Sequence, residues 1–463
     1  MKRIMIWIFA ILLVISSVLA GCNGGSPTKE SETAASETET ATEEESTEAP
    51  TKEADEGPTK FSKWLNASYL ELVPALISKT GYLGEARDTG DNTVTVDVNE
   101  TSFEEYKDYL ELLKEDGFEL YIDNGEGIDD SVFSASLTKE DLVLTVVHIR
   151  PMHKTYVVVG KDLPFSRFLF KDEESIAANP AGAKTTLTMR ELVDFGNGYV
   201  FQLKNGHFLV EDGGLTRDGV NLVKYLESLV PVGTKPVIDA LLITHAHSDH
   251  SGFLGAFMED EKLAERIIVN EILYSTPSDR VLDHTNSDRS QIQQLRLVRY
   301  LFKTESGDAP KIIRPEIGQR YYFNDVVMDI VWTQDFLPLE DMSGDFNDTS
   351  TFVMHYIEGQ KLLFGGDGDW GTMRKLMRAF SSEYLSCDIF HVLHHGYNTW
   401  NDFTDYVKCT VAIDSAPVMR TANAANYYLK ERVQEWLNWG DGGKVLTFPY
   451  KVGTAATLPH IEK

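Results

Sequence analysis

The chain has 463 residues, of which 42% are hydrophobic, and its formal net charge at pH 7 is −29. This length allows two or three domains, and the hydrophobic content is sufficient for ordinary globular cores. An acidic surface repels phosphate backbones, and the sequence has no dense lysine and arginine patch with interleaved aromatic residues. Long nucleic acid is therefore not an expected partner, whereas a small phosphodiester is not excluded.

Residues 1–22 have the pattern of a bacterial export signal. Lys2 and Arg3 precede an apolar stretch, residues 4–19, that is shorter than a comfortable membrane span. Leu19-Ala20-Gly21-Cys22 resembles the lipobox of bacterial lipoproteins, in which the cysteine carries the lipid. An uncleaved membrane anchor is the alternative. In both cases we expect an extracytoplasmic protein held at the cell membrane. In the favoured lipoprotein interpretation, Cys22 is the lipidation site.

Residues 23–60 form a low-complexity segment rich in Ser, Thr, Glu and Ala. It contains 11 acidic residues against 3 lysines and no aromatic residue, so it carries eight of the net negative charges. Such a composition cannot bury enough apolar surface to offset the entropy lost on ordering. We expect a disordered acidic linker that acts as a flexible tether.

Residues 61–175 predict a small α+β domain. Aromatic residues and leucines recur at helical spacing between Ser102 and Gly117, and Ser102 with Glu105 forms a candidate capping box at the start of this helix. Strand-like runs follow at residues 119–123, 132–137, 142–149 and 156–159. The pattern predicts one helix against an antiparallel sheet, with no metal, nucleophile or phosphate motif.

Strand-like and helical runs alternate from residue 185 to residue 463. Residues 200–203 and 207–210 predict a hairpin across Asn205-Gly206, and residues 351–357 and 361–364 predict another. Residues 237–243 predict a buried strand and 321–332 a strand or hairpin, whereas 220–229, 251–266 and 290–302 predict helices. This alternation favours a layered α/β sandwich over a purely parallel sheet.

Two cysteines remain besides Cys22, and both Cys387 and Cys409 lie in apolar runs. A disulfide between them is compatible with an extracytoplasmic location. Two buried free thiols are the favoured interpretation.

Residues 245–250 place four metal-binding side chains within six positions: His245, His247, Asp249 and His250. They directly follow the apolar run 238–243. Imidazole nitrogen and carboxylate oxygen are ligands that zinc, manganese and iron accept. Burying these groups without a metal would cost about 1–3 kcal/mol for each unpaired polar atom. The run therefore predicts a metal site rather than a solvated histidine-rich loop.

Two further strand-like runs end in candidate ligands. Residues 362–366 lead into Asp367, and residues 388–393 lead into His394 and His395. Taken singly, Asp367 is compatible with a turn aspartate and the two histidines with surface residues. Taken with residues 245–250, they predict one shared site at an edge of the sandwich.

The order of these motifs resembles that of the metallo-β-lactamase-fold hydrolases from about residue 186 to the carboxyl terminus. The sequence is most similar to the competence-protein (ComEC-like) branch in the order Glu211-Asp212-Gly213-Gly214, THAHSDH at 244–250, Asn347-Asp348-Thr349-Ser350, Gly366-Asp367 and His394-His395-Gly396. The resemblance implies an αββα sandwich in residues 185–463, with one or two divalent metal ions at the edge of the sheets. Zn²⁺ is the favoured ion and Mn²⁺ the alternative.

The same resemblance implies a role for each candidate. His245 and His247 would bind the first metal, Asp249 and His250 the second, and Asp367 would bridge the two. The last ligand would be His394 or His395, and the Gly-His-Gly form common in the superfamily favours His395. Asp249 and His395 are the candidate catalytic residues, and Asp249 would also act on a water held between the metals.

The chain departs from the family pattern at two places. Many members have another ligand histidine between the first motif and the bridging aspartate, but here that interval contains only His284 and His355, and neither is a convincing ligand. Asn347 or Asp348 is expected to line the site instead. The second departure is Tyr397, which stands where the branch usually has serine. With Trp370 and Trp400 it predicts either an aromatic substrate pocket or, the favoured interpretation, rim and core aromatics.

The resemblance implies metal-dependent hydrolysis of a phosphodiester or related ester outside the cell, and a phosphorylcholine-type or other cell-envelope phosphoester suits the predicted location. Hydrolysis of a lactone or β-lactam is the alternative within the same class. A non-catalytic binding lipoprotein with a degenerate metal site is the alternative from another class, and the absent histidine supports it. No oligomeric state follows from the sequence.

Overall fold

The computed structural model describes residues 68–461 except 89–91, 276–288, 334–345 and 422. Residues Gly57–Lys463 form one compact unit. The predicted signal segment 1–22 with Cys22, the linker 23–60 and His284 lie outside the described residues. Within the described ranges, no helix has both the length and the apolar character needed to cross a membrane.

An antiparallel six-stranded sheet occupies residues 82–161, in the order β1-β2-β6-β5-β4-β3. Its strands are β1 (Tyr82–Asp88), β2 (Thr93–Asn99), β3 (Glu119–Asp123), β4 (Val132–Lys139), β5 (Leu142–Ile149) and β6 (Lys154–Lys161). Helix α2 (Phe103–Glu115) packs on it through Tyr106, Tyr109 and Leu113. The predicted helix and the four predicted strands are confirmed, whereas β1 and β2 were not predicted. The division into separate domains at 61–175 and 185–463 stays a prediction.

The start of α2 is fixed by the capping box that the sequence predicts. The Ser102 hydroxyl accepts a hydrogen bond from Glu105 N (3.2 Å), and Glu105 Oε2 accepts one from Ser102 N (2.8 Å). Two backbone N–H groups that the first helical turn would otherwise leave without a partner are satisfied in this way.

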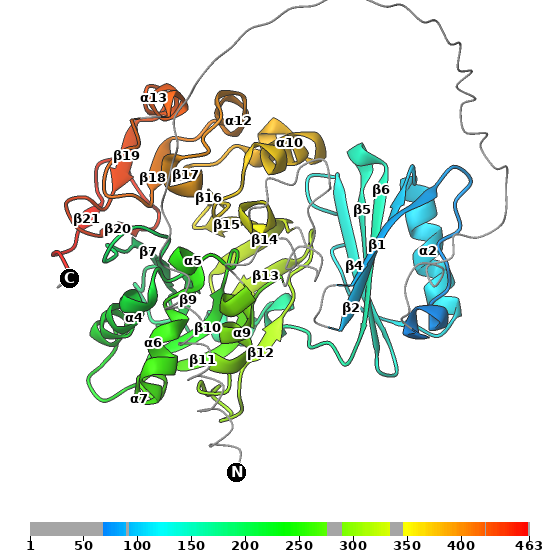
Figure 1. The fold of residues 1–463 in the computed structure, drawn as a ribbon, viewed down its shortest axis with the longest axis horizontal. Coiled ribbons are helices and arrows are strands. Elements are labelled where there is room, and N and C mark those ends of the chain that lie inside the picture. Colours follow the sequence, from blue (N-terminus) through cyan, green and yellow to red (C-terminus); the bar gives the residue numbers. More distant parts are fainter. Residues whose placement is uncertain (1–67, 89–91, 276–288, 334–345, 422, 462–463) are drawn as a thin grey trace, which may run out of the picture. The chain divides into compact units, whose positions relative to one another are not determined.

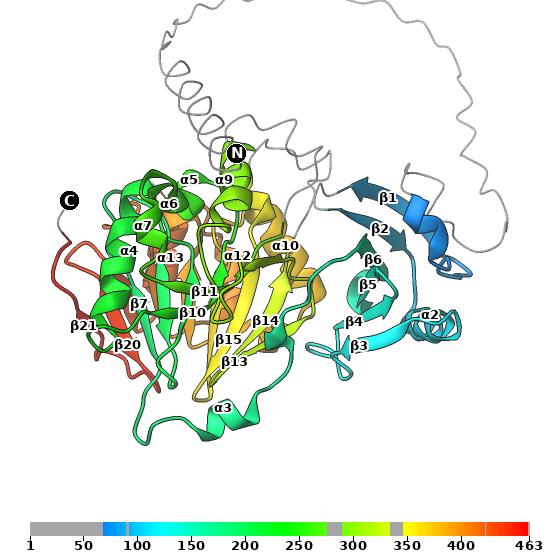
Figure 2. The same cartoon turned by 90° about the horizontal axis from the view of Figure 1, so that it is seen from below.

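The described residues from 186 onward form two stacked sheets covered by helices, as Figures 1 and 2 show. The first sheet has the order β12-β11-β10-β9-β8-β7-β20-β21. Its strands are β7 (Thr186–Met189), β8 (Tyr199–Gln202), β9 (Phe208–Glu211), β10 (Val237–Leu242), β11 (Ile268–Leu273), β12 (Lys311–Ile313), β20 (Lys444–Thr447) and β21 (Ala456–Thr457). Strands β9 to β12 are parallel to one another.

The second sheet has the order β13-β14-β15-β16-β17-β18-β19. Its strands are β13 (Arg320–Phe323), β14 (Val326–Trp332), β15 (Phe352–Ile357), β16 (Gln360–Phe364), β17 (Ile389–Val392), β18 (Val411–Asp414) and β19 (Glu435–Asn438). Strands β16 to β19 are parallel, whereas β13 to β16 are joined by antiparallel pairing.

Apolar side chains fill three layers of the sandwich. Between the sheets, Phe201 and Leu242 of the first sheet share a core with Val353 and Phe364 of the second. The outer face of the first sheet is covered by α4 (Thr216–Ser228), α6 (Leu254–Glu259), α7 (Glu261–Ala264) and α9 (Arg289–Val298). The outer face of the second is covered by α10 (Trp370–Ala379), α11 (Ser382–Leu385), α12 (Asn401–Val407) and α13 (Ala424–Lys430). The predicted αββα architecture is therefore confirmed.

Within the compact unit, the six-stranded sheet contacts the sandwich. Val132 and Ile149 share an apolar cluster with Val331 and Phe352 of the second sheet. Asn124 Nδ2 also donates a hydrogen bond to Gly318 O (2.9 Å).

The Ser102→Ala substitution tests the capping box. We expect it to lower the free energy of unfolding by about 1 kcal/mol, because the amide of Glu105 loses its acceptor. Urea unfolding followed by circular dichroism measures this change. Glu111→Gln removes only the exposed pair with Lys114 and is the control, with an expected change of about 0.5 kcal/mol or less. Equal effects of the two substitutions would contradict the capping role.

Candidate metal centre

The candidate site is built where parallel strands of the two sheets end. Residues 245–250 follow β10, Asp367 follows β16, and His394 and His395 follow β17. Because the carboxyl ends of parallel strands meet at one edge of a sheet, residues far apart in sequence become neighbours there. Gly366 has φ +51°, and a Cβ on it would lie 2.8 Å from Thr244 Oγ1. A glycine is therefore required for β16 to approach β10 so closely.

Asp249 and His250 lie on the short helix α5 (Ser248–Ser251). The single helix predicted over residues 251–266 is wrong, because α5, α6 and α7 are separate turns of helix. The break follows from the amide hydrogen bonds, since Phe253 N donates to Gly214 O (2.8 Å) rather than continuing α5. Gly213 N also donates to His250 O (2.9 Å), which ties α5 to the segment after β9.

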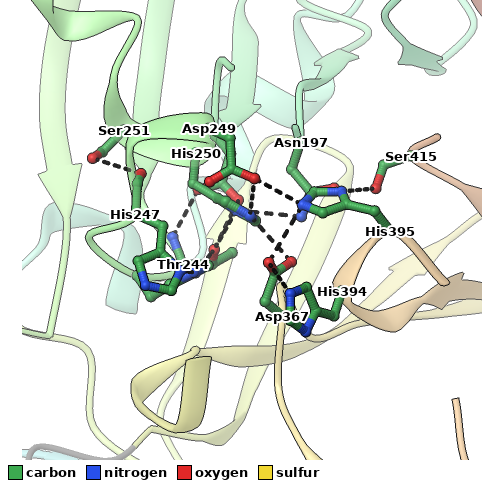
Figure 3. A network of polar contacts seen from close by, with 12 residues as sticks. Asn197, Thr244, His247, Asp249, His250, Ser251, Asp367, His394, His395 and Ser415 are labelled. Carbon is green, nitrogen blue, oxygen red and sulfur yellow. Dashed lines mark hydrogen bonds and ion pairs between the residues drawn. The ribbon is translucent and has the colours of Figure 1, made fainter. Parts of the chain in front are cut away.

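Four side chains converge on one point: Asp249, His250, Asp367 and His395 (Figure 3). One potential ligand atom of each lies within 4.8 Å of those of the others, and all four residues are buried. His395 Nε2 lies 2.9 Å from Asp249 Oδ2 and 3.3 Å from Asp367 Oδ2. His250 Nε2 lies 3.1 Å from Asp367 Oδ1. Two imidazoles and two carboxylates at these distances can surround a single divalent ion.

A second group shares Asp367 and adds His245 and His247. His245 is fully buried, and its Nε2 lies 2.9 Å from His247 Nδ1. The structure thus brings together six of the seven predicted metal ligands, with Asp367 common to both groups.

The hydrogen bonding of two atoms at the centre of the site indicates whether these residues could bind a metal. His250 Nε2 and Asp367 Oδ1 are buried, and although they lie 3.1 Å apart, neither makes a hydrogen bond of good geometry within the described part of the chain. Asp212 Oδ2 lies 2.7 Å from the other ring nitrogen, His250 Nδ1. A proton held on Nδ1 by this carboxylate leaves the Nε2 lone pair directed at the site. The donor set and its orientation therefore fit a divalent cation.

Contacts behind the ligands orient them. Asp212 accepts hydrogen bonds from Thr244 N (2.9 Å) and Thr244 Oγ1 (2.7 Å), which fixes the start of the histidine run. Ser415, which follows β18, places its Oγ 2.9 Å from His395 Nδ1. Neither Asp212 nor Ser415 was predicted to have a role. Asp212 directly follows β9 and Ser415 directly follows β18, each in the same sheet as the strand that precedes the histidine it contacts, and this position is the signal that could have identified them.

The pKa shifts describe the charge balance of these groups without a cation. Burial lowers the pKa of His250, but the carboxylates of Asp367 and Asp212 outweigh it and raise this pKa well above its usual value. Burial also opposes protonation of His395, yet Asp367 and Asp249 raise its pKa to about 9. Burial raises the pKa of Asp367, but the neighbouring His250 and His395 bring it well below its usual value. A bound cation would take the place of the protons that now balance these carboxylates.

His394 and Tyr397 lie at the rim of the site. His394 Nε2 is 3.7 Å from Asp367 Oδ2, the side chain of His394 is 26% exposed, and its φ is +51°. The Tyr397 ring is exposed, and its centroid lies 5.4 Å from that of His394. Of the two adjacent histidines, His395 is the one inside the four-residue group.

Asn347 and Asp348 are buried in the turn η6 (Phe346–Thr349). The segment that follows contacts the site, because Ser350 Oγ accepts a hydrogen bond from Asp367 N (3.2 Å) and Thr351 N donates one to Thr244 O (3.0 Å).

Two further sequence expectations concern residues around the site. His355 lies inside the sandwich, where its Nε2 is 2.6 Å from Glu211 Oε1, so it is not grouped with the candidate ligands. Cys387 and Cys409 are buried free thiols, which confirms the favoured interpretation of these cysteines.

Residues 193–400 match the family model described as the metallo-beta-lactamase superfamily. This match spans somewhat less than half of the chain, and it shows that this part of the chain is similar to the superfamily. None of the curated proteins matches the chain.

Several solved structures are similar at low identity. YhfI of Bacillus subtilis, described as a metallo-beta-lactamase fold protein, is 13% identical over 55% of this chain and 95% of its own, with a TM-score of 0.34. Tm1679, described as a metal-dependent hydrolase of the beta-lactamase superfamily, is 10% identical over 55% and 95%, with a TM-score of 0.33. Zn²⁺-bound PqqB of Methylobacterium extorquens is 11% identical over 52% and 84%, with a TM-score of 0.31. At these sequence identities and TM-scores, the similarity gives no information about the activity of this protein.

Asp212→Asn tests the orientation of His250. Because the amide cannot replace the carboxylate on both Thr244 and His250 Nδ1, we expect zinc affinity to fall by about 10- to 100-fold. Isothermal titration of the metal-free protein with Zn²⁺ measures this loss. Asp329→Asn is the matched control, since Asp329 is a buried aspartate within β14 that pairs with Arg320 and belongs to no group of candidate ligands among the described residues. Unchanged zinc affinity in Asp212→Asn would contradict the orienting role.

Proposed function

We propose that this protein is a metal-dependent hydrolase that works with two divalent ions sharing Asp367. The observation that carries the proposal is the convergence of Asp249, His250, Asp367 and His395 on one buried point, with His245 and His247 on the other side of the same carboxylate. Zn²⁺ is the proposed ion, because imidazole nitrogen and carboxylate oxygen are its usual ligands; Mn²⁺ is the alternative.

The bound ions would supply an activated water and a Lewis acid for the charge that develops on the substrate. The remaining tasks fall to the chain itself. The Asp249 carboxylate is positioned to accept a proton from the water, and His395 Nε2, 2.9 Å from Asp249 Oδ2, would be one of the nitrogens that hold the ion. Ser415 and Asp212 keep the two imidazole rings in place while this happens.

The proposed substrate is a phosphodiester or related ester of the cell envelope. The family resemblance to the ComEC-like branch supports phosphoester chemistry, and the strongly negative net charge argues against a long polyanionic substrate. Lactones and β-lactams are the competing substrates within the same reaction class.

The decisive test measures the metal content and the catalytic turnover of the full-length protein. Emission spectroscopy gives metal ions per chain, and turnover is compared on bis(4-nitrophenyl) phosphate, 4-nitrophenyl phosphorylcholine, a lactone and a β-lactam. We expect phosphodiester turnover, and we expect Asp367→Asn to reduce it by at least about a hundredfold, because the shared ligand is weakened. Asp388→Asn is the control; this residue precedes β17, at the opposite end from His395, and accepts a hydrogen bond from Lys361 N.

Less than about half a metal ion per chain, together with no turnover in added zinc or manganese, would reject the enzyme in favour of a non-catalytic binding protein. Turnover of only the lactone or the β-lactam would reject the phosphodiester proposal while keeping the hydrolase.

We also propose that the protein is a lipoprotein, anchored by Cys22 on the outer side of the cytoplasmic membrane. The lipobox-like sequence and the acidic segment 23–60 support this location. Growth of expressing bacteria with a labelled fatty acid should label the wild-type protein and leave Cys22→Ala unlabelled. Equal labelling of both would reject the proposed anchor.

A further inference from the structure

A cleft of about 410 Å³ lies beside the metal centre, on the side of the second sheet. It adjoins the site through Tyr397, which follows the His-His-Gly turn, and through Trp370, the first residue of α10 after Asp367. Its principal lining residues are Trp370, Tyr397, Thr399, Trp400, Arg420 and Asn423. The proposed hydrolase function does not itself assign a role to this cleft.

Arg420 places a positive charge in the cleft with no carboxylate bound to it. Its Nε is buried without a hydrogen bond, and it forms no salt bridge with any residue that the structure describes. The side-chain stem packs on Gly396, where an added Cβ would lie 3.3 Å from Arg420 Cγ. The buried Nε–H group lacks an acceptor, which a ligand could supply, and a guanidinium binds phosphate and carboxylate well.

The aromatic residues of the cleft have exposed rings. Trp370 is 54% exposed and Tyr397 is 53% exposed. A guanidinium already stacks on each ring: Arg374 lies 4.1 Å from the Trp370 centroid and Arg420 lies 4.6 Å from that of Tyr397. These stacked cations repel a further cation, so the rings suit a sugar or base better than a quaternary ammonium group.

The backbone around the cleft is held by asparagine side chains. Asn426 Nδ2 donates to Gly396 O (2.8 Å) and to Arg420 O (3.1 Å). Asn423 Nδ2 donates to Tyr397 O (2.9 Å). These bonds connect the turn that carries His395 to the segment that carries Arg420. The charge and the ring are therefore held in position before any ligand arrives.

We propose that this cleft is the subsite for the part of the substrate next to the scissile ester, and that it takes a ring-bearing anion: a phosphorylated sugar or a nucleotide. Arg420 binds the anionic group, and the free parts of the Trp370 and Tyr397 rings contact the sugar or base. The proposal rests on the hydrolase function, because it names the substrate class of that same site. It disfavours the phosphorylcholine-type substrate that the sequence suggested.

Binding to the metal-free full chain tests this subsite without any turnover. Tryptophan fluorescence and calorimetry are used with glucose 1-phosphate, thymidine 5′-monophosphate, inorganic phosphate and phosphorylcholine. We expect glucose 1-phosphate or thymidine 5′-monophosphate to bind more tightly than inorganic phosphate, which has no ring, and phosphorylcholine to bind most weakly. The first two ligands distinguish a sugar from a nucleotide.

Arg420→Gln is expected to weaken binding of the preferred ligand by about tenfold or more, since a charge-assisted hydrogen bond is lost. Tyr397→Ser is expected to reduce the preference over inorganic phosphate. Arg432→Gln is the matched control, because Arg432 also stacks on a tyrosine (Tyr428, 3.3 Å) but is paired with Asp405. The thermal midpoint of each variant establishes that it is folded.

The proposal is overturned if neither ring-bearing anion binds, if phosphorylcholine binds more tightly than both, or if Arg420→Gln binds as the wild type does. Two outcomes distinguish failure of the hydrolase proposal from failure of the subsite proposal. Binding with no turnover in metal-loaded protein would reject the hydrolase but keep an anion-binding cleft. Phosphodiester turnover without ligand binding to the metal-free protein would reject the subsite alone.

Discussion

The charge of one buried carboxylate, Asp367, is the constraint on which the rest of the site depends. Its oxygens lie 3.1 Å from His250 Nε2 and 3.3 Å from His395 Nε2, so partners from both sheets meet on it. A buried carboxylate without a compensating charge is strongly destabilising. Either protonated histidines or a cation must therefore balance it, and the groups that do so come from β10 and β17 as well as from β16. This requirement links the packing of the sandwich to its chemistry.

Behind this carboxylate, the site is ordered by contacts that do not touch the centre. Asp212 holds Thr244 and His250 from the first sheet, and Ser415 holds His395 from the second. Each fixes one imidazole nitrogen and leaves the other free to bind a metal. The neighbouring cleft has a different chemistry, with the guanidinium of Arg420 and exposed aromatic rings. The centre would thus perform a reaction common to many proteins of this fold, while the cleft would choose the substrate.

Sequence patterns were sufficient to predict those elements that depend only on residues adjacent in sequence. The Asn205-Gly206 pair predicts a hairpin turn, and Gly206 adopts the positive φ (86°) that such a turn requires. The strands before His245 and Asp367 are marked by the apolar runs 240–243 and 362–364. The patterns were insufficient to predict side-chain contacts between residues that only the pairing of strands in a sheet brings together. Asp212 and Ser415 each stand directly after a strand, but which imidazole each contacts follows from the pairing of the strands and not from the neighbouring sequence. Similarly, Arg420 and Trp370 line one cleft only because the segments that follow β16 and β18 end at the same edge of the second sheet.

Anomalous diffraction from crystals grown with Mn²⁺ or Zn²⁺ tests the central claim most directly. The account predicts one peak among Asp249, His250, Asp367 and His395, and a second among His245, His247 and Asp367, with the Asp367 carboxylate between the two. Absence of a peak in the four-residue group, or metal bound only elsewhere on the protein, would contradict it.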